Sequence, residues 1–219
     1  VDRRCERLIV EKLSSAFPAD GVLGEEGGAR EGSSGRTWII DPLDGTRPYI
    51  RGIPTYSVLL ALEENDEPVV GVIHLSEMNV VCWARKGGGA FCNGEAIHVS
   101  ATASLEEATC SALGHVERAD EQRGKLLLDL MRRWDYAYGF MDAYTYACVA
   151  MGKLDACVNL LDRAWDCAPA ACIVTEAGGR YSDLDGKRTV HSGSIVVSNG
   201  VLHESILAHF AARDGCVSQ

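Results

Sequence analysis

The sequence lacks a long apolar run: its longest extends from Cys167 to Val174, is interrupted by Pro169, and falls short of the ~18 residues that a membrane span needs. No signal-peptide pattern opens the chain. Acidic residues outnumber basic ones by 31 to 21, the formal net charge is −10, and no block of Lys or Arg breaks this excess. Because basic patches hold nucleic-acid phosphates, we expect neither a nucleic-acid partner nor a membrane.

Metal-binding patterns of cysteine and histidine are also missing. The nine cysteines are odd in number and show no C-x-x-C pair, and the six histidines have no ligand spacing. Most cysteines lie among apolar residues, as in Val80-Val81-Cys82-Trp83. This pattern favours reduced, buried thiols in a cytoplasmic protein over disulfides or a zinc site.

What is present is enough apolar sequence, 47% of 219 residues, for a substantial core. The pattern changes near residue 104. In residues 1–103, a helical pattern ending at Ala16 and a Gly/Ser-rich loop at 27–35 precede β-type runs that are typical of an antiparallel meander. Residues 104–219 alternate strands and helices. The sequence therefore predicts two sub-domains, 1–103 and 104–219, in a layered sandwich of the α+β or α/β class.

The boundaries of the expected elements follow from the same periodicities. The expected strands are Thr37–Asp41, Thr55–Leu62, Val69–Leu75, Asn79–Ala84, Gly89–Cys92, Thr109–Leu113, Leu154–Leu160 and Ile195–Ser198. The later helices are expected at Gln122–Arg133, Ala143–Met151, Ala164–Ala177 and Leu202–Ala211.

Acidic residues gather in a pattern that suggests chemistry. The segment W-I-I-D-P-L-D-G-T at 38–46 places Asp41 and Asp44 at the end of a strand, where aspartate is disfavoured. They fit either a turn or helix cap, or a hard-cation site to which a backbone carbonyl adds a ligand. Glu25 follows another short strand, and Asp166 begins an apolar helix as an N-cap or a ligand. Four carboxylates without His or Cys are typical of a Mg²⁺ site, because a cation would offset their repulsion.

Three segments in this order resemble the inositol monophosphatase superfamily: G-E-E at 24–26, W-I-I-D-P-L-D-G-T at 38–46, and W-D…E-A-G-G from 165 to 179. The resemblance extends from Asp2 to the final helix. It implies a phosphomonoesterase that depends on two or three Mg²⁺ ions, accepts Mn²⁺ and is inhibited by Li⁺. It also implies that family's layered sandwich, a homodimer, and a first helix upstream of Val1 that is absent from the chain.

The resemblance assigns roles to individual residues. Five positions match the family's metal ligands: Glu25, Asp41, the carbonyl of Leu43, Asp44 and Asp166. Gly45 and Thr46 match positions whose backbone N–H groups hold the phosphate. Thr46 also matches one half of a Thr–Asp dyad that orients the attacking water, and Asp2 matches the other half. The resemblance therefore assigns catalytic roles to Asp2, Glu25 and Thr46. Glu26 is expected to contact the metal ligands without contacting the metal itself.

Substrate choice depends on the second half of the chain. Asn159 stands where inositol-specific members carry Glu, and Phe140-Met141-Asp142 replaces G-T-A. The stretch from Asp142 to Gly152 resembles the D-x-Y-x-Y…G of histidinol-phosphate phosphatases, and residues 45–52 are similar to that branch's G-T-[KR]-x-F-x-x-G. Asp142 also fits an N-cap of the following helix.

The expected substrate is a small phosphate ester. Histidinol phosphate carries an ammonium and an imidazole group, which favour a carboxylate such as that of Asp142 beside the leaving group. L-histidinol phosphate, a substrate of histidine biosynthesis, is therefore preferred. Inositol 1-phosphate or a broad range of sugar phosphates is the alternative. A catalytically inactive relative that binds metal or phosphate is the second alternative.

Overall fold

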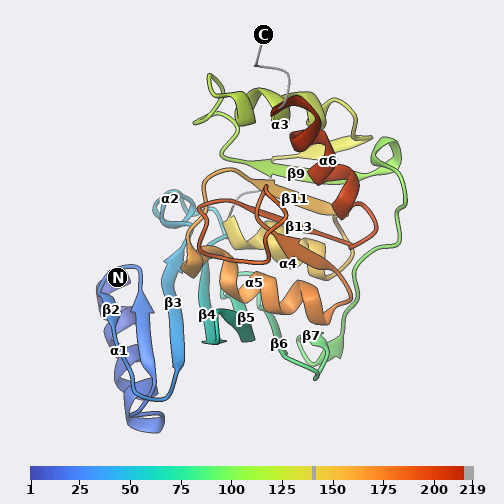
Figure 1. Ribbon diagram of the computed structural model, residues 1–219. Coiled ribbons are helices and arrows are strands. Elements are labelled where there is room, and N and C mark those ends of the chain that lie inside the picture. The colour runs from blue at the N-terminus through green and yellow to red at the C-terminus, as the bar shows by residue number, and fades with distance from the viewer. Residues whose placement is uncertain (140–141, 215–219) are drawn as a thin grey trace.

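The computed structural model describes residues 1–139 and 142–214 and arranges them in alternating layers of helix and sheet (Figure 1). Helices α4 (Asp142–Ala150) and α5 (Ala164–Glu176) lie between an eight-stranded and a five-stranded sheet. The predicted layered α+β sandwich is confirmed. None of the described helices is long and apolar enough to cross a membrane, and the cysteines of the described residues are free thiols.

The eight-stranded sheet uses residues 21–96 in the order β2-β1-β3-β4-β5-β6-β7-β8. Its strands are β1 (Gly21–Gly24), β2 (Gly28–Arg30), β3 (Arg36–Asp44), β4 (Ser57–Glu64), β5 (Glu67–Leu75), β6 (Val80–Arg85), β7 (Ala90–Cys92) and β8 (Glu95–Ala96). Strands β1 and β3 are parallel, and β3 to β8 form the expected antiparallel meander.

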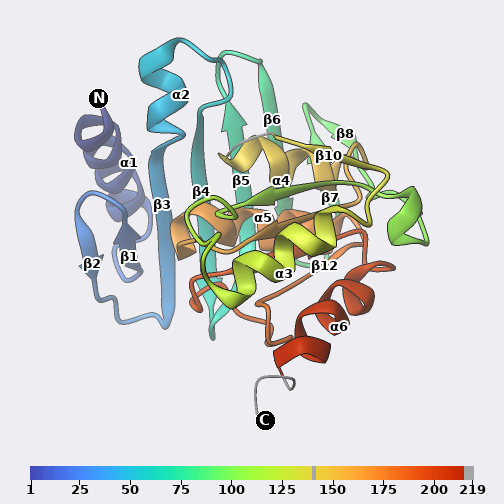
Figure 2. The same cartoon turned by 90° about the horizontal axis from the view of Figure 1, so that it is seen from above.

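The five-stranded sheet has the order β10-β9-β11-β13-β12. Its strands are β9 (Thr109–Leu113), β10 (Tyr136–Tyr138), β11 (Ala156–Asn159), β12 (Arg180–Ser182) and β13 (Ile195–Ser198). Helices α3 (Gln122–Met131) and α6 (His203–Asp214) lie side by side on its outer face (Figure 2). Apolar side chains of these two helices pack onto the sheet, with Leu127, Ile206 and Phe210 buried against Val158 and Val196.

The alternation of side chains along β3 decides what each face of the first sheet meets. Trp38 and Ile40 pack against α1 (Asp2–Ala16), whereas Ile39 joins the core beneath α4 and α5. Because alternate residues share a face, Asp41 points the same way as Ile39, toward α5. The apolar pattern of this strand therefore aims the first carboxylate into the middle of the sandwich.

The strands and helices expected from the sequence are present with small shifts at their ends. Strand β3 continues three residues beyond the expected end at Asp41, because Asp44 pairs again with Ser57 of β4 after a register shift between Asp41 and Asp44. Such an irregularity accommodates Pro42, which cannot donate to a regular ladder. Elements missing from the prediction include the short helix α2 (Thr46–Arg51), the edge strands β2, β8 and β12, and the 3₁₀ turn η1 (Leu105–Glu107).

The division into two sub-domains stays a prediction. The two sheets draw on residues before and after 104, but α5 packs on β4, β5 and β6 of the first sheet. This packing brings Asp166, from the second half of the chain, to the strand that carries Asp41.

Candidate metal centre and active site

A cavity of about 460 Å³ lies where β3, α2, α4 and α5 meet. The predicted site residues that line it are Glu25, Asp41, Leu43, Asp44, Gly45, Thr46, Asp142, Asn159 and Asp166. Asp2 and Glu26 are not among its lining residues. The fold therefore brings most of the predicted site residues to one cavity from four separate parts of the chain.

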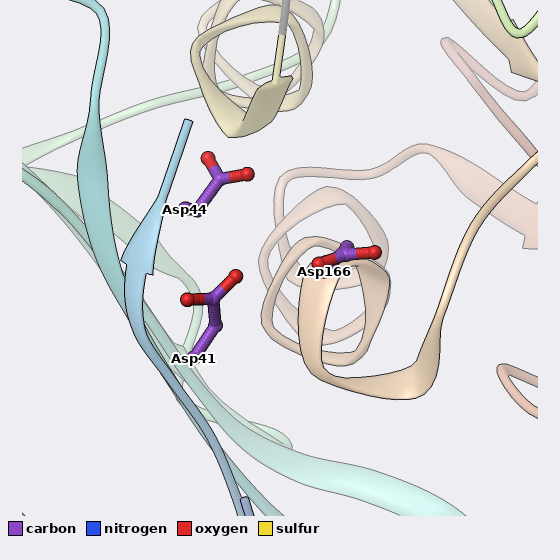
Figure 3. Close-up of side chains that lie close together, drawn as sticks. All are labelled: Asp41, Asp44 and Asp166. Carbon is purple, nitrogen blue, oxygen red and sulfur yellow. The ribbon is translucent and has the colours of Figure 1, made fainter. Parts of the chain in front are cut away.

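Three carboxylates form a compact acidic cluster in this cavity. Carboxylate oxygens of Asp41, Asp44 and Asp166 lie within 4.8 Å of one another. Both strand aspartates project toward the helix that carries Asp166 (Figure 3). The Leu43 N–H donates to Asp41 Oδ1 at 2.9 Å and holds that carboxylate in place. The break in register after Asp41 allows Asp44 to reach the same cluster.

Asp166 is not the N-cap of α5, because Arg163 occupies that place and Asp166 is the third residue of the helix. Its Oδ2 nevertheless accepts a hydrogen bond from the backbone N–H of the N-cap residue Arg163 at 3.0 Å. The same carboxylate contributes an oxygen to the acidic cluster. Capping therefore fixes the orientation of the carboxylate that reaches Asp41 and Asp44.

Asp44 is held from two directions. Its Oδ2 accepts hydrogen bonds from Ser57 Oγ at 2.8 Å and from the Ala143 N–H at 2.9 Å. Burial and the neighbouring charge of Asp142 nevertheless raise the pKa of Asp44 to about 8. The two donors fix the side chain without supplying the positive charge that an ionised, buried carboxylate requires.

The cluster has the electrostatics of a cation site. Burial and the charges of Asp44 and Glu25 raise the pKa of Asp41 to about 10. Burial and the charge of Asp166 raise the pKa of Glu25, whose side chain lies within hydrogen-bonding reach of Asp41. Burial also raises the pKa of Asp166. Carboxylates this close ionise together only beside a compensating cation, and an all-oxygen donor set fits a hard divalent ion.

Gly45 and Thr46 form the rim of the cavity beside the cluster. Gly45 adopts φ 78°, a left-handed conformation that suits glycine, and precedes the first residue of α2. A Cβ atom at Gly45 would lie 3.0 Å from Asp142 Oδ2 and 3.3 Å from the Cα of Tyr56. Glycine therefore permits both the turn and the close approach of Asp142.

Asp142 lines the cavity and carries an unused acceptor. Helix α4 begins at Asp142 rather than at the expected Ala143, and the N–H of Ala143 is bound by Asp44. The Oδ2 atom of Asp142 is buried and has no hydrogen-bond partner among the described residues. Phe140 and Met141, the other two residues of the predicted F-M-D segment, lie outside the described residues.

Asp2 and Glu26 influence the cavity residue Glu25 without lining the cavity themselves. The charge of Asp2 contributes to the raised pKa of Glu25, after burial and the charges of Asp166 and Glu26. The Thr46 hydroxyl donates to the Leu43 carbonyl at 3.2 Å, so the structure shows no Thr46–Asp2 pair. Glu26 forms an ion pair with Arg3 at 3.1 Å, and its N–H donates to the buried Glu6 at 2.9 Å.

The model of the inositol monophosphatase family matches residues 1–214. The chain belongs to this family. A histidinol-phosphatase of Streptomyces coelicolor is 39% identical over 223 residues, which cover 97% of this chain and 83% of that protein. A fructose-1,6-bisphosphatase/inositol-1-monophosphatase of Thermotoga maritima is 36% identical over 209 residues, covering 94% and 79%. The solved structure of a Thermotoga maritima IMPase superimposes with a TM-score of 0.85 at 36% identity, covering 96% of this chain and 82% of that one.

These identities confirm the predicted resemblance to the inositol monophosphatase family and to histidinol phosphatases. This member of the family is a phosphoric monoester hydrolase. The family is metal-dependent, and the acidic cluster supplies the corresponding donor set.

Two cavity residues of this inositol monophosphatase family member were not assigned a role from the sequence. Tyr146 and Asp162 are buried and line the cavity beside Asn159. Tyr146 belongs to the D-x-Y-x-Y pattern, and Asp162 lies in the same segment as Asp166. The sequence therefore points to both positions but does not show that their side chains form a hydrogen bond. Their contact depends on the packing of α4 against the loop before α5, which the sequence pattern does not reveal.

Proposed function

We propose that this phosphatase hydrolyses L-histidinol phosphate with Mg²⁺ held by the acidic cluster, Glu25 and the Leu43 carbonyl. The observation that carries the substrate assignment is the Oδ2 atom of Asp142, a buried acceptor without a partner among the described residues. Burial and the charge of Asp166 raise the pKa of this carboxyl. An ammonium group on the substrate would stabilise its ionised form.

The arrangement of the cavity supports this assignment. Asp142 lies against Gly45, at the rim where the phosphate is proposed to bind, so a short alcohol would bring its amino group to the carboxylate. A charge-assisted hydrogen bond of this kind contributes about 1.5–3 kcal/mol. The identity of 39% with the histidinol-phosphatase of Streptomyces coelicolor points to the same substrate.

The chain's own residues would bind and orient the ester. A divalent ion in such a site supplies Lewis-acid stabilisation of the negative charge on phosphate oxygens. The backbone N–H groups of Gly45 and Thr46 would hold the phosphate beside the cluster. The Thr46 hydroxyl, whose hydrogen is bound to the Leu43 carbonyl, would accept a hydrogen bond from the attacking water. The carboxylate of Glu25 would help to orient this water, and Asp2 would act through its charge on Glu25. Asp44 and Asp166 are prearranged by hydrogen bonds from Ser57, Ala143 and Arg163, so they need little reorganisation.

Inositol 1-phosphate is the second candidate. The identity of 36% with the fructose-1,6-bisphosphatase/inositol-1-monophosphatase of Thermotoga maritima favours it. Against it stands Asn159, which replaces the carboxylate expected of inositol-specific members with an amide. The homodimer, the acceptance of Mn²⁺, the inhibition by Li⁺ and the cytoplasmic location stay predictions.

A panel of esters tests the proposal. Phosphate release would be measured from L-histidinol phosphate, myo-inositol 1-phosphate and p-nitrophenyl phosphate, with Mg²⁺ and with EDTA. We expect turnover with Mg²⁺ that EDTA abolishes, and the highest kcat/KM for histidinol phosphate. A higher kcat/KM for inositol 1-phosphate would overturn the substrate assignment, and turnover that persists in EDTA would overturn the metal assignment.

A further inference from the structure

Three hydrogen-bonded side chains, those of Tyr146, Asp162 and Asn159, line the cavity. Tyr146 Oη donates to Asp162 Oδ2 at 2.5 Å, and Asn159 Nδ2 donates to Tyr146 Oη at 3.0 Å. The three residues come from α4, the end of β11 and the loop before α5. All three are buried and line the cavity. Two hydrogen bonds thus join side chains from three elements.

The hydrogen bonds of Asp162 determine which group donates and which accepts in the series from Asp162 through Tyr146 to Asn159. Asp162 Oδ1 accepts from the Arg163 N–H at 3.0 Å, and its Oδ2 accepts from Tyr146. Because the tyrosine hydrogen is committed to Asp162, its oxygen can only accept from Asn159. The Asn159 Oδ1 in turn accepts from the Leu161 N–H at 3.0 Å. The orientation of the Asn159 amide is therefore determined at both of its ends.

One hydrogen of this amide is left over. The Asn159 NH₂ group carries two hydrogens, and one of them is bound to Tyr146. Among the described residues no acceptor binds the other, and Asn159 lines the cavity. Asn159 thus offers a donor to a ligand in the cavity, whereas Asp142 keeps a buried acceptor that has no partner among the described residues. A glutamate at 159 would have offered acceptors only.

We infer that Tyr146 and Asp162 are positioning residues that make Asn159 a hydrogen-bond donor to the substrate, and that the cavity selects a phosphomonoester whose alcohol carries an acceptor lone pair. This inference rests on the proposed function, in that the ester occupies this cavity. Its ligand class is an alcohol with an amine for Asp142 and a neutral ring nitrogen or hydroxyl oxygen for Asn159. The two contacts together would recognise both polar groups of an amino alcohol that bears an imidazole.

A double-mutant cycle tests whether Tyr146 acts through Asn159. The variants are Tyr146→Phe, Asn159→Ala and the double variant, with Tyr144→Phe as the control on the same helix, because Tyr144 does not line the cavity. The readout is the ratio of kcat/KM for L-histidinol phosphate to kcat/KM for phenyl phosphate, whose alcohol carries no amine and no acceptor beyond the ester oxygen. Thermal unfolding of every variant checks that it is folded.

We expect each single variant to lower this ratio about tenfold, the double variant to lower it no further, and Tyr144→Phe to leave it unchanged. If the two losses instead multiply to about a hundredfold in the double variant, Tyr146 does not act through Asn159 and the inference is overturned. An unchanged ratio in a folded Tyr146→Phe protein would overturn the positioning role.

Asp162→Asn provides a second test. An amide at position 162 can still accept from the Arg163 N–H but offers Tyr146 a donor, so the tyrosine hydrogen must turn toward Asn159 and oppose its NH₂ group. We expect the same fall in the substrate ratio. The Mg²⁺ concentration for half-maximal turnover of p-nitrophenyl phosphate is measured separately, because it shows whether the substitution has disturbed the proposed metal ligand Asp166. A change in that concentration without a change in the ratio would overturn the assignment of Asp162 to substrate selection.

Failure of the proposed substrate is distinguishable from failure of this inference. If the wild-type protein hydrolyses inositol 1-phosphate but not histidinol phosphate, the proposed substrate is wrong. The same cycle is then run with inositol 1-phosphate, whose hydroxyl oxygens are acceptors, in place of histidinol phosphate. With inositol 1-phosphate, losses that multiply in the double variant, or a ratio that stays unchanged in Tyr146→Phe, would likewise overturn the inference.

Discussion

The Oδ2 atom of Asp44 accepts a hydrogen bond at 2.9 Å from the backbone N–H of Ala143, which lies 99 positions further along the chain. Asp44 belongs to the acidic cluster of Asp41, Asp44 and Asp166, and Ala143 follows Asp142, the proposed substrate contact, on α4. This bond therefore links the position of the proposed metal ligands to the position of the proposed substrate contact. A substitution of Asp44 is therefore expected to shift the start of α4, and a displacement of Ala143 is expected to shift the carboxylate of Asp44.

Replacing Asp41 by Asn should separate activity from stability. The variant loses a ligand of the proposed Mg²⁺ site, and removal of several kcal/mol of charge stabilisation corresponds to a loss of at least about a thousandfold in kcat. In EDTA the same variant should unfold at a higher temperature than the wild type, because an amide at position 41 avoids the unfavourable proton uptake on folding that the raised pKa of Asp41 implies.

Thermal unfolding with Mg²⁺ and with EDTA measures this effect. For the wild type, Mg²⁺ at 100 times its Kd should add about 2.7 kcal/mol to the free energy of unfolding, and Asp41→Asn should lose most of that gain. Asp120→Asn, an exposed aspartate outside the cavity, is the control. An equal response to Mg²⁺ in Asp41→Asn and in the wild type would place the ion elsewhere.

Asp142→Asn should change substrate preference. The amide keeps the shape of the side chain but loses the charge that attracts an ammonium group, so kcat/KM for histidinol phosphate should fall about tenfold or more. The loss for p-nitrophenyl phosphate, which has no ammonium, should be clearly smaller. Steady-state kinetics with both esters provides the measurement. Equal losses would show that Asp142 only supports the shape of the site.

Alanine substitutions at Gly45 and Gly52, two glycines of similar conformation, distinguish the effect of backbone strain from the effect of a changed site geometry. Gly45 has φ 78° and Gly52 has φ 70°, so alanine at either position costs about 1 kcal/mol of stability. Only at Gly45 does the added Cβ meet Asp142 Oδ2, at 3.0 Å, since nothing lies within 4 Å of a Cβ at Gly52. We expect both variants to unfold at reduced temperatures, Gly45→Ala at the lower one because of these contacts, and only Gly45→Ala to lose activity, by tenfold or more. Similar activities would argue against the close approach of Asp142 to the rim.

His203 should make the protein less stable in mild acid. Its Nδ1 and Nε2 atoms are hydrogen-bonded to Ser198 and Ser182, each at 2.9 Å, in the buried interface below α6. Burial, assisted by the charge of Arg180, lowers the pKa of His203 to about 4. Between that value and about 6.5 the unfolded chain binds a proton that the folded chain does not, so the free energy of unfolding falls as the pH falls through this range.

The loss attributable to His203 should total about 3 kcal/mol between pH 7 and pH 4. It is measured as the difference in pH dependence between the wild type and His203→Gln by calorimetric unfolding, with His98→Gln as the exposed control. The pH dependence should become shallower in His203→Gln and stay as in the wild type in His98→Gln. Parallel curves for the wild type and His203→Gln would contradict the assignment.

The sequence by itself determined the class of the fold and the chemical type of the site. Alternating apolar residues in β4 and β5 and the apolar run of α5 specify strands and a buried helix, because periodicity of burial is a local property of the chain. Asp41 and Asp44 could be singled out because aspartates at the end of an apolar strand are costly unless they are used. The edge strands β2 and β8 escaped prediction because they are too short to carry a pattern.

Tertiary structure alone decided which of these residues meet. The approach of Asp166 to Asp41 and Asp44 depends on the packing of α5 against the first sheet, and the chain of Tyr146, Asn159 and Asp162 depends on how α4 lies against the loop before α5. The assignment of the Ala143 N–H to Asp44, and the unused oxygen that Asp142 keeps, have the same origin. Hydrogen bonds between residues far apart in sequence form only once the core has fixed their separation, so no local pattern encodes them.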